Sequence, residues 1–195
     1  MTVKKNLLIA NAKKTDNFLR NYFKNQKNSG LIKSMKYGSL SGGKKIRSSI
    51  IISAGKLFNL KANKLLNICG AVECIHSYSL IHDDLPCMDD DKLRRGKPST
   101  HIKYGESTAV LAGNSLLTLA FEMIVDRKYK VSDSTKVALI KEIAICSGHT
   151  GIAGGQYLDL KFEKQKKNLK QIIDMQRKKT GKLFNFCCLA AGVIA

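Results

Sequence analysis

Proline is scarce in this 195-residue chain: there are two, one within an acidic segment and one shortly after it. Elsewhere apolar residues recur at helical spacing, and no stretch alternates apolar and polar residues as a half-buried strand does. These two shortages predict an all-α protein. We expect helices over residues 3–26, 44–58, 61–82, 107–128, 132–148 and from 169 to the C-terminus, with breaks at 28–30, 41–43, 83–100 and 151–155.

Signals for export, membrane insertion and disulfide bonding are also missing. The six cysteines show no Cys-x-x-Cys spacing and four lie in apolar surroundings, which indicates reduced, core-packed thiols. The N-terminus has a four-residue apolar stretch, too short for a secretory signal. The uncharged run 183–195 is too short to span a bilayer. We therefore expect a cytoplasmic protein with no membrane span, and residues 1–195 as a single domain.

Acidic residues are few, with 15 Asp and Glu against 34 Lys and Arg, for a formal net charge of +19. This excess suits anionic substrates, nucleic acid or an anionic membrane, so it discriminates poorly between them. No recognised nucleic-acid motif is present and aromatic residues make up just 7% of the chain. We expect no nucleic-acid partner, and most Lys-rich runs should be solvated helix faces.

Five of these acids fall within the nine residues 83–91, just before Arg94 and Arg95. Carboxylates this close repel each other unless a hard cation or several donors neutralise them. Mg²⁺ accepts one or two carboxylates and completes its octahedron with phosphate oxygens and water. The segment therefore predicts a magnesium and diphosphate site, with Asp83 ending a helix, Asp84 turned about 100° from it, and Asp89 brought back by the loop.

A second candidate phosphate site precedes this segment. Gly42 and Gly43 are predicted to open a helix whose backbone N–H groups can approach an anion. Lys44 and Arg47, at i and i+3, would share one face of that helix. His76 and Asp83 share a face of the helix over 61–82, separated by about 10 Å along its axis.

These motifs occur in the order found in the trans-polyprenyl diphosphate synthase family, together with residues 73–82, 93–100, 111–117, 154–160 and 179–181. The chain closely resembles that family, and most of all its bacterial farnesyl diphosphate synthases. The resemblance implies an isoprenoid synthase-like helical bundle around a deep central cavity. It covers about the N-terminal two thirds of a family-length chain, and the family's second Asp-rich motif would lie beyond residue 195. We therefore expect a chain cut inside a buried helix, with weak or no activity alone.

The resemblance also implies an activity. It is the Mg²⁺-dependent condensation of isopentenyl diphosphate with dimethylallyl or geranyl diphosphate to farnesyl diphosphate, by an enzyme expected to be a homodimer. The resemblance implies that Asp83, Asp84 and Asp89 hold Mg²⁺ against the allylic diphosphate. It implies that Arg94, Lys179 and Thr180 bind the same diphosphate. Lys179 and the three aspartates are then the catalytic residues. The resemblance assigns the binding of isopentenyl diphosphate to Gly43, Lys44, Arg47, His76 and Arg95. It also makes Gln156 a substrate-binding residue, in a Gly-Gly-Gln-x-x-Asp segment that ends at Asp159.

Two residues depart from the family pattern, and two others are candidates for the control of product length. The family's usual Arg after Gly-Gly-Lys is Lys45 here, and its Pro after the next Arg is Ser48. In the family an aromatic residue five positions before the first aspartate limits the product to fifteen carbons, and here it is Tyr78. On a helical wheel Ser79 lies about 40° from Asp83 and Tyr78 about 140°, so both are chain-length candidates and the role of Tyr78 rests on the resemblance.

The acidic segment is also compared with a calcium loop and with a metal phosphohydrolase site. A calcium loop counted from Asp83 would need Gly where Met88 stands and Glu where Arg94 stands, so it is excluded. A His-Asp metal phosphohydrolase could use His82 with Asp83, and His76, His101 and His149 as further ligands. That reading leaves Arg94 and Arg95 without a role. A fragment that is inactive, or that works only with a partner chain, stays open.

Overall fold

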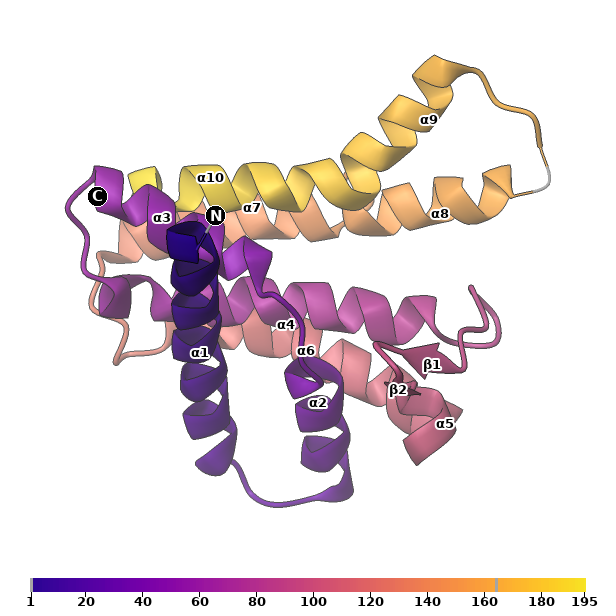
Figure 1. The fold of residues 1–195 in the computed structure, drawn as a ribbon, viewed down its shortest axis with the longest axis horizontal. Coiled ribbons are helices and arrows are strands. Elements are labelled where there is room, and N and C mark those ends of the chain that lie inside the picture. Colours follow the sequence, from indigo (N-terminus) through magenta and orange to yellow (C-terminus); the bar gives the residue numbers. More distant parts are fainter. Residues whose placement is uncertain (1, 164) are drawn as a thin grey trace.

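Helix α4 (Leu66–Asp83) is the axis of the fold. A computed structural model describes residues 2–163 and 165–195, and α6 (Glu106–Val125) packs along the length of α4 (Figure 1). Twelve of the 18 residues of α4 are buried, on all sides of the helix. A helix that is apolar all round is covered on every side, so α4 can place its last residues at a fixed point of the molecule.

The other helices surround this pair. Helices α1 and α2 form a hairpin that crosses α4 and α6 in Figure 1, while α3 and α7 both pack against α10. Helices α8 and α9 extend at the end where α4 stops. The bounds of these elements are α1 Thr2–Lys24, α2 Gly30–Leu40, α3 Ile46–Leu57, α5 Thr100–Tyr104, α7 Asp133–Ser147, α8 Ile152–Phe162, α9 Leu169–Gln176 and α10 Lys182–Ile194. Two short turns, η1 (Ala62–Leu65) and the π-helical η2 (Arg177–Gly181), precede α4 and α10.

Apolar residues from five α-helices and the η1 turn supply the largest side chains of the core. The largest fully buried side chains are Leu19, Phe23, Ile51, Ile52, Leu65, Ile68, Ile75, Leu116, Met123, Ile124, Leu139 and Ile143. Local signals fix where several helices start: Ser29 and Ser132 cap α2 and α7, and Asn168 forms a reciprocal capping box with Gln171 at α9. All six cysteines are free and four are buried, which confirms the expectation of core-packed thiols.

The all-α prediction is confirmed, and each of the six predicted ranges contains a helix. Three helices were missed: the five-residue α5 and two helices of eleven residues each. Gly30–Leu40 carries two glycines and two serines between two expected breaks, and Ile152–Phe162 begins with the Gly154-Gly155 pair that was assigned to a turn. Both are helical because tertiary packing outweighs these weak local preferences. The expected loop after α4 also contains a two-stranded hairpin, β1 (Leu93–Arg94) paired antiparallel with β2 (Lys97–Pro98).

Helix α6 is long and apolar enough to cross a membrane by length and composition alone. It lies against α4, and Ala112, Leu116 and Ala120 are fully buried there. A buried core helix passes the same test of length and composition, so α6 is weak evidence for a membrane span.

Candidate active site

The acid loop, residues 83–91, starts at the C-terminal end of α4. Asp83 is the last residue of the helix, and the backbone N–H of Asp89 donates a hydrogen bond to the Asp83 carbonyl at 2.9 Å. The loop therefore returns to the helix end, as predicted, and brings Asp89 beside Asp83. Burial, with the charges of Asp89 and Asp84, raises the pKa of Asp83 to about 6 against the opposing effect of Lys179.

Asp84 has a different environment from Asp83. It is almost fully buried, and its carboxylate accepts hydrogen bonds from Nε (2.9 Å) and a terminal nitrogen of Arg94. The same Arg94 nitrogen donates to Asp91 at 2.9 Å. Burial raises the pKa of Asp84 although Arg94 opposes the shift. In this structure Asp84 and Arg94 therefore bind each other, and Asp84 anchors the β1–β2 hairpin to the end of α4.

The far wall of the acid loop comes from α8 and η2. Gln156 donates its amide to Asp89 at 3.3 Å, and Lys179 Nζ donates to Asp159 at 2.6 Å. Burial opposes ionisation of Lys179, but the hydrogen bond to Asp159 and the charges of Asp83 and Asp89 together raise its pKa. The Gly-Gly-Gln-x-x-Asp segment and Lys179 thus lie next to the acid loop. The roles that the resemblance implies for them require this arrangement.

Glycine makes this close approach possible. A Cβ built on Gly155 would lie 2.1 Å from the backbone nitrogen of Lys179, so any larger residue would push η2 away from α8. The π-helical turn itself moves Lys179 off the regular α-helical register, and such turns are frequent at functional sites. Thr180, the next residue, is exposed.

Asp83 and Asp89 have the chemistry that Mg²⁺ selects. Both supply hard carboxylate oxygens, and the burial of Asp83 leaves its charge poorly solvated. Among residues 2–163 and 165–195, no three His, Cys, Asp or Glu side chains are grouped closely enough to form a metal cage. Mg²⁺ fits this donor set, since it is usually held by one or two carboxylates with substrate phosphates, whereas an all-protein cage is typical of other ions.

A cation pocket lies beside α4 at His76, two turns before Asp83. It has a volume of about 460 Å³ and is lined by residues 43–47 with Glu73, His76 and Arg95. We use the name cation pocket for Lys44, Arg47, His76 and Arg95. The Nε of Arg47 is buried and has no hydrogen-bond partner, although its guanidinium stacks 4.6 Å from the ring centroid of Phe184. A buried guanidinium donor without a partner is ready to receive an anion.

His76 is neutral in the cation pocket. Burial, followed by the charges of Arg47 and Arg95, lowers its pKa to about 3. Burial likewise lowers the pKa of Arg47, but a guanidinium stays protonated in proteins. The pocket therefore presents arginine charge and an uncharged imidazole that can donate or accept a hydrogen bond.

The loop before α3 carries Lys44, and its conformation differs from the prediction. Helix α3 begins at Ile46, so Lys44 and Arg47 do not share a helix face, although they line the same pocket. Gly42 and Gly43 have φ values of 97° and 111°, which favour glycine. Arg95 reaches across from the hairpin and donates to the Gly42 carbonyl. A Cβ on Gly43 would lie 2.6 Å from the Arg95 guanidinium, so Gly43 also makes room for that arginine.

Lys45 is structural here. Its side chain is 3% exposed, and Nζ donates to the Ser39 carbonyl at 2.8 Å and lies 3.6 Å from Glu73 and 3.7 Å from Asp16. It therefore ties α1, α2 and α4 to the loop. The exchange of the family's Arg for Lys45 consequently falls in the pocket wall, at a side chain whose ammonium group is bound to Ser39.

Glu73 is a residue that the sequence analysis did not assign. It is 3% exposed, it accepts hydrogen bonds from the backbone N–H and the hydroxyl of Ser48, and it faces Lys45. Glu73 lies one turn before His76 on α4, so one carboxylate fixes the start of α3 next to the pocket. It is the sole charged residue between Leu66 and Ile75, and that isolation in an apolar run is the signal that could have found it.

The histidines do not converge on Asp83. The Nε2 atom of His82 lies 3.1 Å from the Val110 carbonyl, and the ring fills the space left by Gly113 on α6. His101 is buried and His149 is exposed on the turn before α8. The structure therefore gives a His-Asp metal centre no set of ligands among the described residues.

Tyr78 and Ser79 lie deeper along α4. Tyr78 is buried, donates its hydroxyl to the Ser147 carbonyl at 3.2 Å, and packs edge-on to His82. Burial, with the charge of Asp83, raises its pKa to about 12. Ser79 Oγ donates to the His76 carbonyl at 3.0 Å. Their effect on product length stays a prediction.

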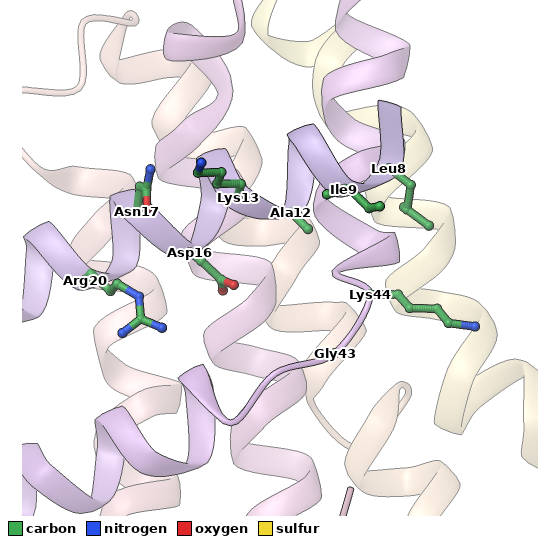
Figure 2. Close-up of a pocket in the computed structure, with 9 residues that line it drawn as sticks. All are labelled: Leu8, Ile9, Ala12, Lys13, Asp16, Asn17, Arg20, Gly43 and Lys44. Atoms are coloured by element: carbon green, nitrogen blue, oxygen red, sulfur yellow. The ribbon is translucent and has the colours of Figure 1, made fainter. Parts of the chain in front are cut away.

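A second hollow, of about 470 Å³, shares Gly43 and Lys44 with the cation pocket (Figure 2). Helix α1 forms its other wall through Leu8, Ile9, Ala12, Lys13, Asp16, Asn17 and Arg20. The Lys44 side chain points away from Asp16 and Arg20 in this view. Gly43 and Lys44 therefore line both hollows.

Known proteins with this arrangement are prenyl synthases. The profile of the polyprenyl synthetase family matches residues 28–195. The chain belongs to the polyprenyl synthetase family. It is 46% identical over 157 residues to the farnesyl diphosphate synthase of Escherichia coli strain K12, covering 80% of this chain and 52% of that one. It is 40% identical over 198 residues to the Bacillus subtilis strain 168 enzyme of the same name, covering 100% of this chain and 67% of that one.

Solved structures of this family have the same fold. The geranyltransferase of Legionella pneumophila superposes with a TM-score of 0.94 at 33% identity, over 98% of this chain and 68% of that one. A farnesyl/geranylfarnesyl diphosphate (FPP/GFPP) synthase of Zymomonas mobilis gives 0.93 at 36%, over 100% and 72%. The all-α isoprenoid synthase fold is therefore confirmed. The chain spans about half the length of several curated relatives that it matches, including the Escherichia coli enzyme.

Proposed function

We propose that this polyprenyl synthetase family member is a Mg²⁺-dependent prenyltransferase that condenses isopentenyl diphosphate with dimethylallyl or geranyl diphosphate to give farnesyl diphosphate. One observation carries the proposal. A single helix, α4, holds His76 of the cation pocket and, two turns later, Asp83 of the acid loop. Two diphosphates can thus be bound along one helix, one by cations and one through carboxylates, as a condensation of two diphosphates requires.

The acid loop would bind the allylic substrate. Asp83 and Asp89 would hold Mg²⁺, and the resemblance to the family makes Asp84 the third ligand. When bound, the metal neutralises charge that develops on the departing diphosphate. Lys179, held by Asp159, faces Asp83 and Asp89 and would donate to the same diphosphate. The resemblance also assigns Arg94 to this diphosphate. Arg94 would exchange its hydrogen bond to Asp91 for one to a phosphate oxygen, while it keeps its hydrogen bond to Asp84.

The cation pocket would bind isopentenyl diphosphate. Arg47 supplies a buried donor without a partner, and Lys44 and Arg95 supply charge from the loop and the hairpin. Neutral His76 adds a hydrogen bond without adding charge. These groups hold the second substrate beside the allylic one, so the double bond can attack the allylic carbon as the diphosphate leaves. A dry cavity then delays capture of the carbocation by water, and loss of a proton completes the product.

We further propose that the protein is a homodimer in the cytoplasm. The side of α6 away from α4 exposes Val110, Leu111 and Val125, each at least 39% accessible. Exposed Asn114, Thr118 and Glu122 lie between them on α6, so the proposed homodimer rests on the resemblance to the family. Six free cysteines, four of them buried, are typical of a reducing compartment.

The test is product analysis with both substrates and Mg²⁺. The expected result is a fifteen-carbon alcohol after dephosphorylation. Asp83→Asn should lower turnover at least about 1,000-fold, because a charged group at the reacting diphosphate is lost. Asp90→Asn is the matched control: it removes one charge from the same loop at an exposed residue with φ of 50°, which asparagine tolerates. If the two variants retained equal activity, the site assignment would be wrong.

Product length is a separate outcome of this assay. Replacement of Tyr78 by Ala would remove a buried ring and open space below the acid loop. The expected product is longer than fifteen carbons, and an unchanged product would reject Tyr78 as the floor. Phosphate release from a nucleotide without prenyl transfer would instead support a phosphohydrolase.

A further inference from the structure

A basic hollow of about 590 Å³ lies between α1, α2 and α5, away from the acid loop and the cation pocket. Its lining is Arg20, Lys24, Lys33, Lys36, Tyr37, Leu40 and Tyr104. No carboxylate lines it. Lys103 joins this set because its Nζ lies 4.1 Å from the ring centroid of Tyr37. We call these eight residues the accessory pocket.

The cations of the accessory pocket have no acidic partners. Within the described ranges, none of Arg20, Lys24, Lys33, Lys36 and Lys103 forms an ion pair, whereas the cations around the acid loop do. Five like charges around one hollow repel each other, and that repulsion falls when an anion of several charges enters.

The arrangement differs from an ordinary solvated lysine run. The charges come from the α1–α2 hairpin and from α5, which is far from that hairpin in the sequence and meets it only in the folded chain. Two tyrosines form a fixed wall between them: Tyr37 and Tyr104 pack edge-to-face at 5.5 Å, and Lys103 is held over both rings. Arg20 also closes one end of the hollow along α1 that Figure 2 shows.

We propose that the accessory pocket is a second binding site for a diphosphate or longer polyphosphate group. Lysine binds phosphate as a point charge, and two linked phosphates can reach cations on α1 and α2 at once. The volume lies within the range of about 300–1,000 Å³ that is usual for small-ligand sites. The inference does not depend on the proposed prenyl transfer.

Tyr37 connects the accessory pocket to the candidate active site. Its hydroxyl donates to the Pro98 carbonyl on β2 at 2.6 Å, and its ring also lines a narrow space that contains Asp84 and Arg94. An anion bound beside Tyr37 and Lys103 therefore contacts the residue that supports the hairpin.

The experiment is calorimetric titration with inorganic diphosphate in low salt and a chelator. An Arg47→Gln/Arg95→Gln background silences the cation pocket, and one binding site should remain. In that background Lys33→Glu/Lys36→Glu should weaken binding at least about tenfold. Lys56→Glu/Lys141→Glu makes the same charge change at exposed residues outside the accessory pocket and should leave affinity within about twofold. Far-UV circular dichroism verifies that each variant keeps its helices.

A milder pair, Lys33→Gln/Lys36→Gln, covers the case in which charge reversal unfolds the chain; it should weaken binding about threefold or more. ADP that binds at least as tightly as diphosphate, and loses affinity in the same variants, would support the proposal and identify a nucleotide as the source. The proposal is overturned if the Arg47→Gln/Arg95→Gln protein binds no diphosphate, or if charge reversal leaves the affinity unchanged. It is also overturned if only phosphatidylglycerol vesicles are bound, because the surface would then recognise a membrane.

Discussion

The cation pocket and the acid loop lie two turns apart on α4, yet they handle charge in opposite ways. In the cation pocket the charges are unpaired: Arg47 has a buried donor without a partner, and His76 stays neutral among arginines. Around the acid loop several charges have charged partners, as in Asp84 with Arg94 and, on the facing wall, Lys179 with Asp159. The first region can take a diphosphate as it stands, whereas the second must exchange partners when its ligand and metal arrive.

The largest expected effect follows from the unpaired charge. Arg47→Gln should weaken binding of isopentenyl diphosphate by about 100-fold, since a buried charge-assisted contact is lost. The free energy of unfolding should change by less than about 1 kcal/mol, because the arginine has no ion pair to lose. Titration calorimetry and chemical denaturation measure the two quantities. Arg127→Gln on the surface is the control, and a large loss of stability would show that Arg47 is structural.

Arg94→Gln should show the reverse pattern. It leaves the carboxylate of Asp84, 3% exposed, without its partner, so the protein should lose about 2 kcal/mol of stability. We discount the usual penalty for breaking a buried pair because the Arg94 side chain is 31% exposed. Denaturation with urea would detect the loss, and Arg127→Gln again serves for comparison. An Arg94 variant as stable as the parent would contradict the anchoring role of Asp84.

The same comparison explains what the sequence could predict. Helical periodicity placed His76 and Asp83 on one face of α4, and the acid cluster identified Asp83 and Asp89, because both signals are local. Periodicity could not show that Asp84 binds Arg94, that the buried Lys45 binds the Ser39 carbonyl, or that Glu73 holds the start of α3. Those pairings join segments that are distant in the sequence or emerge from loops. Helix α8 was missed for a related reason: Gly155 serves the packing of η2, and glycine there resembles a turn signal.

Asp83→Asn should stabilise the metal-free protein in a pH-dependent way. Burial raises the folded-state pKa of Asp83 to about 6, while the unfolded chain titrates near the usual 3.8. The folded state thus binds more protons between these values, and stability is lost as pH rises from about 4 to 6. The variant should gain about 1–2 kcal/mol at pH 7, with solvent screening discounted, and almost nothing at pH 3.5. Denaturation in a chelator across this range is the measurement, and equal gains at both pH values would contradict it.

The smallest effect is expected at His76, where the charge of the cation pocket can be read directly. Burial, Arg47 and Arg95 lower its pKa to about 3, so ¹⁵N chemical shifts should report a neutral ring down to about pH 4. A bound diphosphate would offset part of the arginine charge and should raise this pKa by about one unit. Burial, the largest cause, persists in the complex, so the ring should remain neutral at pH 7. Exposed His149 is the internal control and should not respond to diphosphate. A His76 that titrated near 6.5 in the free protein would mean that the arginine charges are solvated, and the contrast between the two ends of the site would disappear.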